Sequence, residues 1–473
     1  MTRLFTVLLI LSGLLSPSML SAQDSWQSLI NRLTYYSPEK YKSAVNNLKK
    51  KYPDSYRPDA GWEKAVSELE TNKETLISGL KAKDTKAEKQ ATKLLQQLDA
   101  ALLANPLLAD KQVVAIRRTL GDKARKAMSG ELGIAPSNFQ NNSEIGNPKG
   151  GWTNEFVSLD IIPGKIKQTT LYKPEPGMII TDPEPHFDGN KLMYSSIGSS
   201  DHWQLFELDL KTGKTRQLTP DTYKDFDSFD GCYTPDGRYI FCSTGTFLGL
   251  PCTDGGNKMC GLFLYDPKTG RTRQLTYDQD SNWGPVIMDN GTVLYQRWEY
   301  ADLPHSNSRL LFTMNPDGTT QSAFYGSNSY FPTSFFNARP IPGRPSAVVG
   351  IASGHHSVSR SGRMLIIDTN KGRHEADGVV AEIPYAGKKV EAIVRDRLPD
   401  GIWPQFLQPY PLNDTYYLVS MKENPESLWG LYLVDTFDNR TLIAEEENVA
   451  YLEPVLMDSR KTPNVIPDRV DLA

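Results

Sequence analysis

The sequence predicts a mainly β protein, a β-propeller preceded by an α-helical segment, and a repeated phrase is the first reason. Residues 205–220 read LFELDLKTGKTRQLTP, and residues 262–277 read LFLYDPKTGRTRQLTY. Looser copies follow at 310–325 and 431–446. Repetition at a period of about 50 residues, with a hairpin turn inside each unit, is typical of a ring of small antiparallel sheets.

Turn signals are the second reason for this fold class. Residues 235–237 and 316–318 both read Pro-Asp-Gly, and residues 289–291 read Asp-Asn-Gly. Proline presets φ for a turn, and glycine accepts the positive φ that tight hairpins require. Because strand-like runs flank these turns, we interpret their Asp and Gly residues as structural and assign no chemistry to them.

The strand-like runs fall into six groups, which predicts a six-bladed β-propeller over residues 106–473. The first group, residues 111–173, lacks an inner strand, and the run YLEPVLM at 451–457 lacks partners. We expect these N- and C-terminal strands to share one sheet and so close the ring, which removes free sheet edges. A seven-bladed ring is the alternative. The other five groups lie near 178–220, 225–278, 281–328, 330–395 and 402–447.

Residues 23–105 differ in composition from the rest of the chain. Lys, Glu, Ala, Leu and Gln dominate, and apolar residues recur at helical spacing, as within 69–80. The dipeptide Ser37-Pro38 reads as a helix start. We interpret this segment as a helical cap or spacer beside the propeller, and a partner-binding bundle is the alternative. The expected helices lie near 25–51, 60–81 and 84–104.

The N-terminus reads as a cleaved signal peptide, residues 1–22. Arg3 supplies the positive charge, Leu4 to Leu15 form a short apolar core, and Ser21-Ala22 offers a small-residue cleavage site. An apolar run of about a dozen residues is shorter than a membrane span requires. No later segment is apolar enough to cross a bilayer. We therefore expect a periplasmic or extracellular protein.

The overall composition is that of an ordinary globular protein. The 473 residues are 39% hydrophobic and 23% charged, with a formal net charge of −4. This near-neutral charge gives no reason to expect nucleic-acid binding. We expect the partner to be an unidentified small molecule or protein.

The four cysteines lie within one predicted blade. Cys252 and Cys260 bracket a short Gly-rich loop, and we expect them to form a disulfide, as suits an exported protein. Cys232 and Cys242 flank a hairpin, and they are either paired or buried thiols. Neither a Cys-x-x-Cys pair nor histidines at ligand spacing accompany them, so the sequence does not predict a zinc site here.

Candidate ligand-binding residues cluster in polar, aromatic stretches at 280–309 and 354–363. Loops at the mouth of a propeller carry function while the ring positions them. The three histidines of this set are weak candidates for a divalent metal site, and the alternative is that each caps a loop. The motif Gly-x-Ser-x-Gly of serine hydrolases is missing. The candidates are Trp283, Arg297, Glu299, His305, His355 and His356.

Longer phrases go beyond a generic propeller. FDGCYTPDGRYIFCST, YGSNSYFPTSFFNARPIPG, VVGIASGHH, SLWGLYLVD and PNVIPDRVDL are examples. From about residue 105 onwards the chain resembles the hydrazine synthase alpha-subunit-like family. The resemblance implies an exported propeller and a haem enzyme. Covalent c-type haem requires Cys-x-x-Cys-His, which is missing from this sequence, so we expect no covalent haem and predict no cofactor.

The sequence thus leaves three functional hypotheses. The first is a non-haem scaffold that binds a ligand or a protein at the propeller mouth. The second is a metal-dependent propeller enzyme, a lyase or hydrolase, that uses the loops around His305 and His355. The third is a haem-less subunit of a redox complex.

Overall fold

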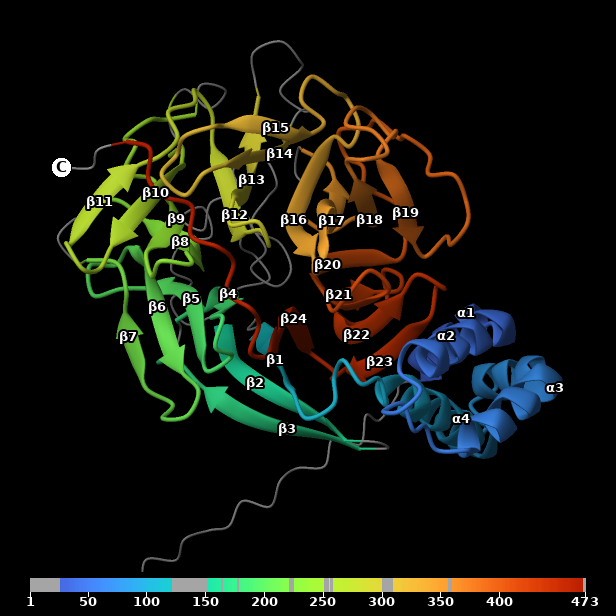
Figure 1. Cartoon of the computed structure of the whole chain (residues 1–473). Coiled ribbons are helices and arrows are strands. Elements are labelled where there is room, and N and C mark those ends of the chain that lie inside the picture. Colours follow the sequence, from blue (N-terminus) through green and yellow to red (C-terminus); the bar gives the residue numbers. More distant parts are fainter. Residues whose placement is uncertain are drawn as a thin grey trace, which may run out of the picture.

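The computed structural model describes a mainly β protein with helices at one side (Figure 1). Several antiparallel sheets are arranged around a common centre, and α1 to α4 lie together beside them. Within the described residues, no helix combines the length and the apolar character that a bilayer span requires. The described residues are 26–120, 152–162, 165–176, 178–220, 225–250, 255, 258–299, 309–355 and 360–470.

The helical segment contains one more helix than the sequence pattern indicated. The break falls at Ser37, whose side chain accepts a hydrogen bond from Lys40 N at 3.5 Å as an N-cap. Pro38 follows at the first helical position, and a residue before proline disfavours the α conformation. The expected helix over 25–51 is therefore two helices. The four are α1 (Trp26–Tyr35), α2 (Pro38–Lys51), α3 (Gly61–Lys81) and α4 (Thr85–Leu103).

The first sheet joins the two ends of the β region. Its order is β24-β1-β2-β3, so the C-terminal strand lies beside the first strand of the chain. The pairing of β24 with β1 is antiparallel and runs from Gln112 opposite Met457 to Thr119 opposite Val449. This strand is the inner partner that the first group of runs lacked. The bounds are β1 (Gln112–Leu120), β2 (Trp152–Ile162), β3 (Lys165–Tyr172) and β24 (Val449–Met457).

Three further sheets are four-stranded and follow the chain order. One contains β4 (Thr181–Pro185), β5 (Lys191–Ile197), β6 (Trp203–Asp209) and β7 (Thr215–Gln217). The next contains β8 (Ser228–Tyr233), β9 (Tyr239–Ser243), β10 (Gly261–Asp266) and β11 (Arg271–Gln274). The third contains β20 (Gln405–Pro411), β21 (Tyr416–Lys422), β22 (Gly430–Asp435) and β23 (Arg440–Ala444).

The largest sheet consists of two antiparallel groups that meet at one point. A single parallel pair, Arg309 opposite Ser334, joins β14 to β16. The first group contains β12 (Asn282–Ile287), β13 (Val293–Trp298), β14 (Arg309–Met314) and β15 (Ser322–Tyr325). The second contains β16 (Ser334–Ile341), β17 (Arg344–Ser353), β18 (Arg363–Asp368) and β19 (Val379–Ile383).

The helices share an apolar core with the sheets. One buried cluster contains Leu48 and Leu98 from the helices together with Tyr416 and Leu431 from β21 and β22. Tyr416 Oη lies 3.3 Å from Ala44 O and 3.0 Å from Asn47 Oδ1 of α2, within hydrogen-bond distance of both. Burial of this apolar surface stabilises the contact between the two parts.

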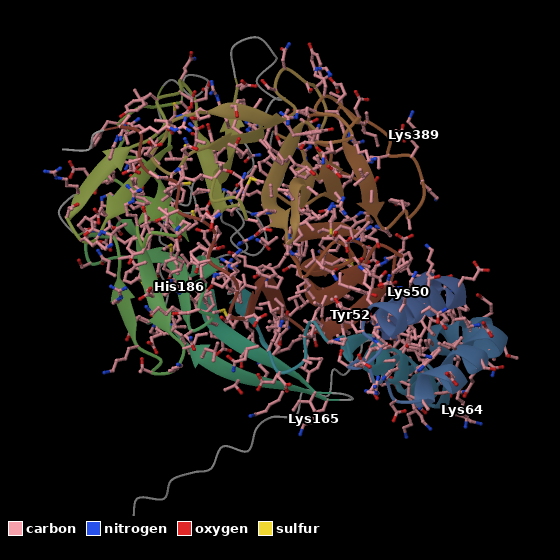
Figure 2. The ribbon with its side chains drawn as sticks, in the orientation of Figure 1. Lys50, Tyr52, Lys64, Lys165, His186 and Lys389 are labelled. Atoms are coloured by element: carbon pink, nitrogen blue, oxygen red, sulfur yellow. The ribbon has the colours of Figure 1, made fainter. Side chains whose placement is uncertain are left out.

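Polar contacts rim the same interface. Lys51 Nζ lies 3.1 Å from Asp414 Oδ1, and Lys40 Nζ lies 2.8 Å from Asp438 Oδ2. Figure 2 shows Tyr52 where the helices meet the sheet of β20–β23. Because exposed ion pairs contribute little to stability, the shared apolar core stabilises this interface more than the two ion pairs do.

Residues 458–470 follow β24 without forming a strand, and they run along the turns of two other sheets. Arg460 N donates a 2.9 Å hydrogen bond to Phe187 O, in the turn after β4. Both Nη atoms of Arg238, in the turn between β8 and β9, donate to Asp468 at 2.8 and 2.7 Å. This C-terminal strap fastens the second and third sheets to the end of the chain.

The cysteines within the described residues are free thiols. Cys232, Cys242 and Cys260 are buried, and burial raises the pKa of the first two thiols well above the ordinary value. Of the alternatives for Cys232 and Cys242, the structure has buried thiols rather than a pair. Cys252 lies outside the described residues, so its expected disulfide with Cys260, which is here a free thiol, stays a prediction.

We expect Tyr416→Ala to lower the free energy of unfolding by about 3–5 kcal/mol, because it empties a buried aromatic site. Tyr416→Phe removes the hydroxyl alone and should cost about 0.5–1.5 kcal/mol. Urea denaturation measures both values, and hydrogen exchange reports on α2. Unchanged protection of the α2 amides in Tyr416→Ala would mean that the helices do not depend on this contact.

Candidate functional site

The inner strand of each group is the one nearest the common centre (Figure 1). In β4, β8, β12, β16 and β20 the register shifts, and it shifts again where β24 pairs with β1. At each shift one residue has a φ between 47° and 57°, in the left-handed region. Extra residues of this kind are β-bulges. The six bulge residues are Asp182, Asp230, Gly284, Asn337, Gln408 and Glu453.

The left-handed conformation is costly for several of these residues. Glycine adopts it freely, and Asp and Asn tolerate it. For Gln408 and Glu453 it costs about 1–2 kcal/mol each. Backbone strain of this kind persists where the surroundings enforce it, and it gathers at binding and catalytic sites. The bulge residues are therefore the first place to look for function.

All six bulge residues line one cavity of about 80 Å³, to which the inner strands each contribute. A water molecule requires about 10–15 Å³ on this measure, so the cavity has room for several waters or for a ligand of a few heavy atoms. The wall also contains Glu184, Trp283, Gln296, Arg339 and Arg360.

Side chains of the bulge residues bind the backbone of the neighbouring sheet. Gln408 Oε1 accepts a hydrogen bond from Glu453 N at 3.4 Å, and Glu453 Oε2 accepts one from Asp182 N at 2.6 Å. Asp230 Oδ2 accepts one from Gly284 N at 3.1 Å. Thr181 Oγ1 adds a 2.8 Å bond to Glu453 Oε1. These bonds link the inner strands sideways around the cavity.

Two of the carboxyl groups hold their protons to unusually high pH. Burial, the larger cause, and the negative charge of Asp182 together raise the pKa of Asp230 to about 8, against the positive charge of Arg360. Burial and the charge of Asp182 likewise raise the pKa of Glu453 to about 7, against the charge of Arg118. Near neutral pH each group is partly protonated, so each is both a donor and an acceptor of hydrogen bonds.

The two arginines of the cavity wall have different surroundings. Arg339 forms an ion pair with Glu184, and Arg460 Nη2 lies 3.1 Å from Glu184 Oε1. In Arg360, Nε and Nη2 are buried and have no hydrogen-bond partner among the residues that the structure describes. Buried polar atoms are rarely left unpaired, so the Arg360 guanidinium is available to a ligand.

An aromatic stack forms another part of the wall. Trp283 lies in the cavity wall and is 4% exposed, and its ring stacks on Trp298 with 6.3 Å between centroids. The Arg309 guanidinium lies 4.1 Å from the Trp298 centroid, as in a cation–π contact. Trp283 Nε1 is buried and has no hydrogen-bond partner in the described part of the chain.

Among the sequence candidates that the structure describes, Trp283 lies in the cavity wall, and Arg297, Glu299 and His355 do not. Arg297 Nη2 lies 2.9 Å from Asp278 Oδ1, and Glu299 Oε2 accepts a 3.1 Å bond from Ser327 Oγ. His355 is 1% exposed and its ring lies 5.7 Å from that of Trp298, outside the cavity wall. His305 and His356 lie outside the described residues. No group of three or more His, Cys, Asp or Glu side chains within the described ranges is arranged to hold a metal ion.

Sequence reasoning missed the bulge residues, although a signal for them exists. Each inner strand has a bulge residue followed by Pro, Gly or Ala. Proline lacks an N–H group, so it fits a strand edge that faces no partner. The inner strands read TDPEP, FDGCY, WGPVI, FNARP, LQPYP and LEPVL, at residues 181–185, 229–233, 283–287, 336–340, 407–411 and 452–456.

Comparison with known proteins supports the propeller fold and goes no further. No protein-family model and no curated protein matches the chain. Kuenenia stuttgartiensis hydrazine synthase is similar over 75% of this chain and 48% of its own, at 14% identity and a TM-score of 0.54. This chain thus spans about half of that structure's length. At such low identity the likeness shows the fold alone.

Two other solved structures are more distant. TolB from Acinetobacter baumannii has a TM-score of 0.46 at 13% identity, covering 80% of this chain and 74% of its own. An oligogalacturonate lyase in complex with manganese has a TM-score of 0.38 at 13% identity, covering 72% of this chain and 82% of its own.

The raised pKa values predict a stability that falls as the pH rises. The folded protein holds the Asp230 and Glu453 protons more tightly than the unfolded chain, so stability declines from about pH 4 to about pH 8. Asp230→Asn removes one of these groups. As the pH rises from about 5 to about 9, the difference in free energy of unfolding between the variant and the wild type should therefore shift in favour of the variant.

Urea denaturation at a series of pH values measures this difference. Asp236→Asn is the matched control, because bonds to Arg238 and Thr234 outweigh burial and lower the pKa of Asp236. That variant should lose stability relative to wild type as the pH rises through the acid range. A loss of relative stability in Asp230→Asn at alkaline pH would contradict the raised pKa.

Proposed function

We propose that this chain is an exported, six-bladed propeller that binds a small polar molecule in the cavity where its inner strands converge. The observation that carries the proposal is that six bulge residues with a positive φ, one on each inner strand, line the same cavity. A ring that places one residue per sheet at a single point builds a site from segments far apart in the sequence. Ligand sites formed by rigid elements are well positioned for binding.

The count of six blades is supported by the sheets and by the bulges. Four sheets are four-stranded, and the eight-stranded sheet consists of two groups joined at Arg309 and Ser334. Each of the six groups has its own bulge residue on its inner strand. The pairing of β24 with β1 supports closure by the N- and C-terminal strands.

Export is supported by residues 1–22, whose charge, apolar core and small residues are those of a signal peptide. The phrases that resemble the hydrazine synthase alpha-subunit-like family suggest descent from an exported propeller. Since Cys-x-x-Cys-His is missing from the sequence, we propose a ligand-binding scaffold and not a covalent haem protein.

Filling the cavity tests the proposal. A Cβ atom at Gly284 would meet nothing within 4 Å, and Asn tolerates a φ of +57°. Gly284→Asn should therefore fold normally and narrow the cavity. Equilibrium dialysis of the purified protein against a defined mixture of amino acids, amines, organic acids and sugars, read by mass spectrometry, measures what is retained.

We expect wild-type protein to retain at least one compound and Gly284→Asn to lose it. Gly213→Asn is the matched control, because Gly213 has a φ of +67°, open space around it and a place in the hairpin between β6 and β7. This variant should retain the compound. If the wild type retains nothing, or if both variants bind alike, the central cavity is not the binding site.

A further inference from the structure

The wall of the central cavity contains one arginine, Arg360, and two carboxyl groups, Asp230 and Glu453, that form no ion pair within the described residues, and this observation deepens the proposed function. Asp230 and Glu453 accept hydrogen bonds from backbone N–H groups and from Thr181, and neither forms an ion pair within the described residues. Arg360 lines the same cavity, and its buried Nε and Nη2 have no partner there. Charged groups that are removed from water require partners.

The other charges of the wall are paired within the protein. Glu184 binds both Arg339 and Arg460. Arg118 is buried, and its positive charge acts most strongly on Glu453 and then on Asp182. The groups of the wall that form no ion pair within the described residues are the guanidinium of Arg360 and the carboxyl groups of Asp230 and Glu453; the charge of Arg360 acts on Asp230, and that of Arg118 acts on Glu453.

A second donor belongs to the same cavity wall. Arg360 follows the loop after β17, and Trp283 belongs to β12, yet both line the same cavity. Trp283 Nε1 is a donor without a partner in the described part of the chain, and the side chain is 4% exposed. Indole N–H and guanidinium groups donate and never accept, so they require a ligand with acceptor oxygens.

From these contacts we propose that the cavity binds a small zwitterion of amino-acid size. Its carboxylate accepts hydrogen bonds from Arg360 and Trp283, and its ammonium group donates to Asp230 and Glu453. Arginine recognises a carboxylate through two parallel N–H bonds, and carboxyl groups are the ordinary partners of an ammonium ion. The cavity of about 80 Å³ limits the ligand to a few heavy atoms.

This inference rests on the proposed function, and the choice of probes separates the two. Glycine and β-alanine carry both charges, acetate carries the anionic half, and methylammonium carries the cationic half. Isothermal titration calorimetry of the full chain should show a zwitterion binding at least about tenfold more tightly than either half, because each charged hydrogen bond adds affinity.

Variants assign the two ends of the ligand. Arg360→Gln should weaken zwitterion and acetate binding about tenfold or more and leave methylammonium binding unchanged. Asp230→Asn should weaken zwitterion and methylammonium binding and spare acetate. Arg344→Gln is the matched control, because Arg344 forms an ion pair with Asp368 away from the cavity, and its binding should equal that of wild type.

The outcomes distinguish the two proposals. If either half-ligand binds as tightly as the zwitterions, or if Arg360→Gln binds them as wild type does, the zwitterion assignment is wrong. If neither zwitterion binds while another compound is retained by wild type and lost from Gly284→Asn, the cavity is a binding site for a different class of ligand. If no compound depends on Gly284, both proposals are wrong.

Discussion

The inner edge of each sheet sets the main constraint on this structure. Five of the six inner strands form an edge of their sheet, and the sixth, β16, meets β14 at one residue pair. Backbone N–H and C=O groups along such an edge must find partners other than a strand. Gln408, Glu453 and Asp230 meet this need by binding the backbone N–H of the next bulge residue.

The same constraint shapes the chemistry of the cavity. A side chain that binds the backbone of the neighbouring inner strand must be polar, must match the distance between the two strands, and must be held in place at the bulge. Acidic and amide residues satisfy these requirements, and their convergence concentrates negative charge in a poorly hydrated space. The raised pKa values of Asp230 and Glu453 follow from this arrangement, since burial and the negative charge of Asp182 both favour the protonated form.

The fold was far more predictable than the site. Gly237 and Gly318, expected to turn hairpins, have φ values of 88° and 85°. The phrase at 262–277 contains β11 and all of β10 except Gly261, and the run at 451–457 falls within β24. The sequence predicts these features because turns and the alternation of strand residues depend on residues that are close together in the chain. The break at Ser37-Pro38 was also visible, although its effect on the first helix was underestimated.

The cavity was hidden because its residues come from separate sheets and are individually ordinary. Histidines and aromatic residues drew attention to 297–309 and 354–363, yet Arg297 and Glu299 have partners elsewhere. Trp283 was a candidate because it lies near the expected start of an inner strand. Arg360 lies in the stretch 354–363 but was not chosen as a candidate. Asp182 and Glu453 are far apart in the chain, and a single polar residue before a proline carries no chemical signal until the ring brings such residues together.

The C-terminal strap bears on the order in which the molecule assembles. A ribosome delivers the second and third sheets long before residues 458–470, yet Phe187 and Arg238 in those sheets receive their partners from that last stretch. The strand β24, which completes the first sheet, also arrives late. During synthesis β1 therefore waits without its partner β24, and the final assembly step is one of long-range contacts, which form slowly. A chain with this topology gains from a chaperone that shields its early sheets until translation ends.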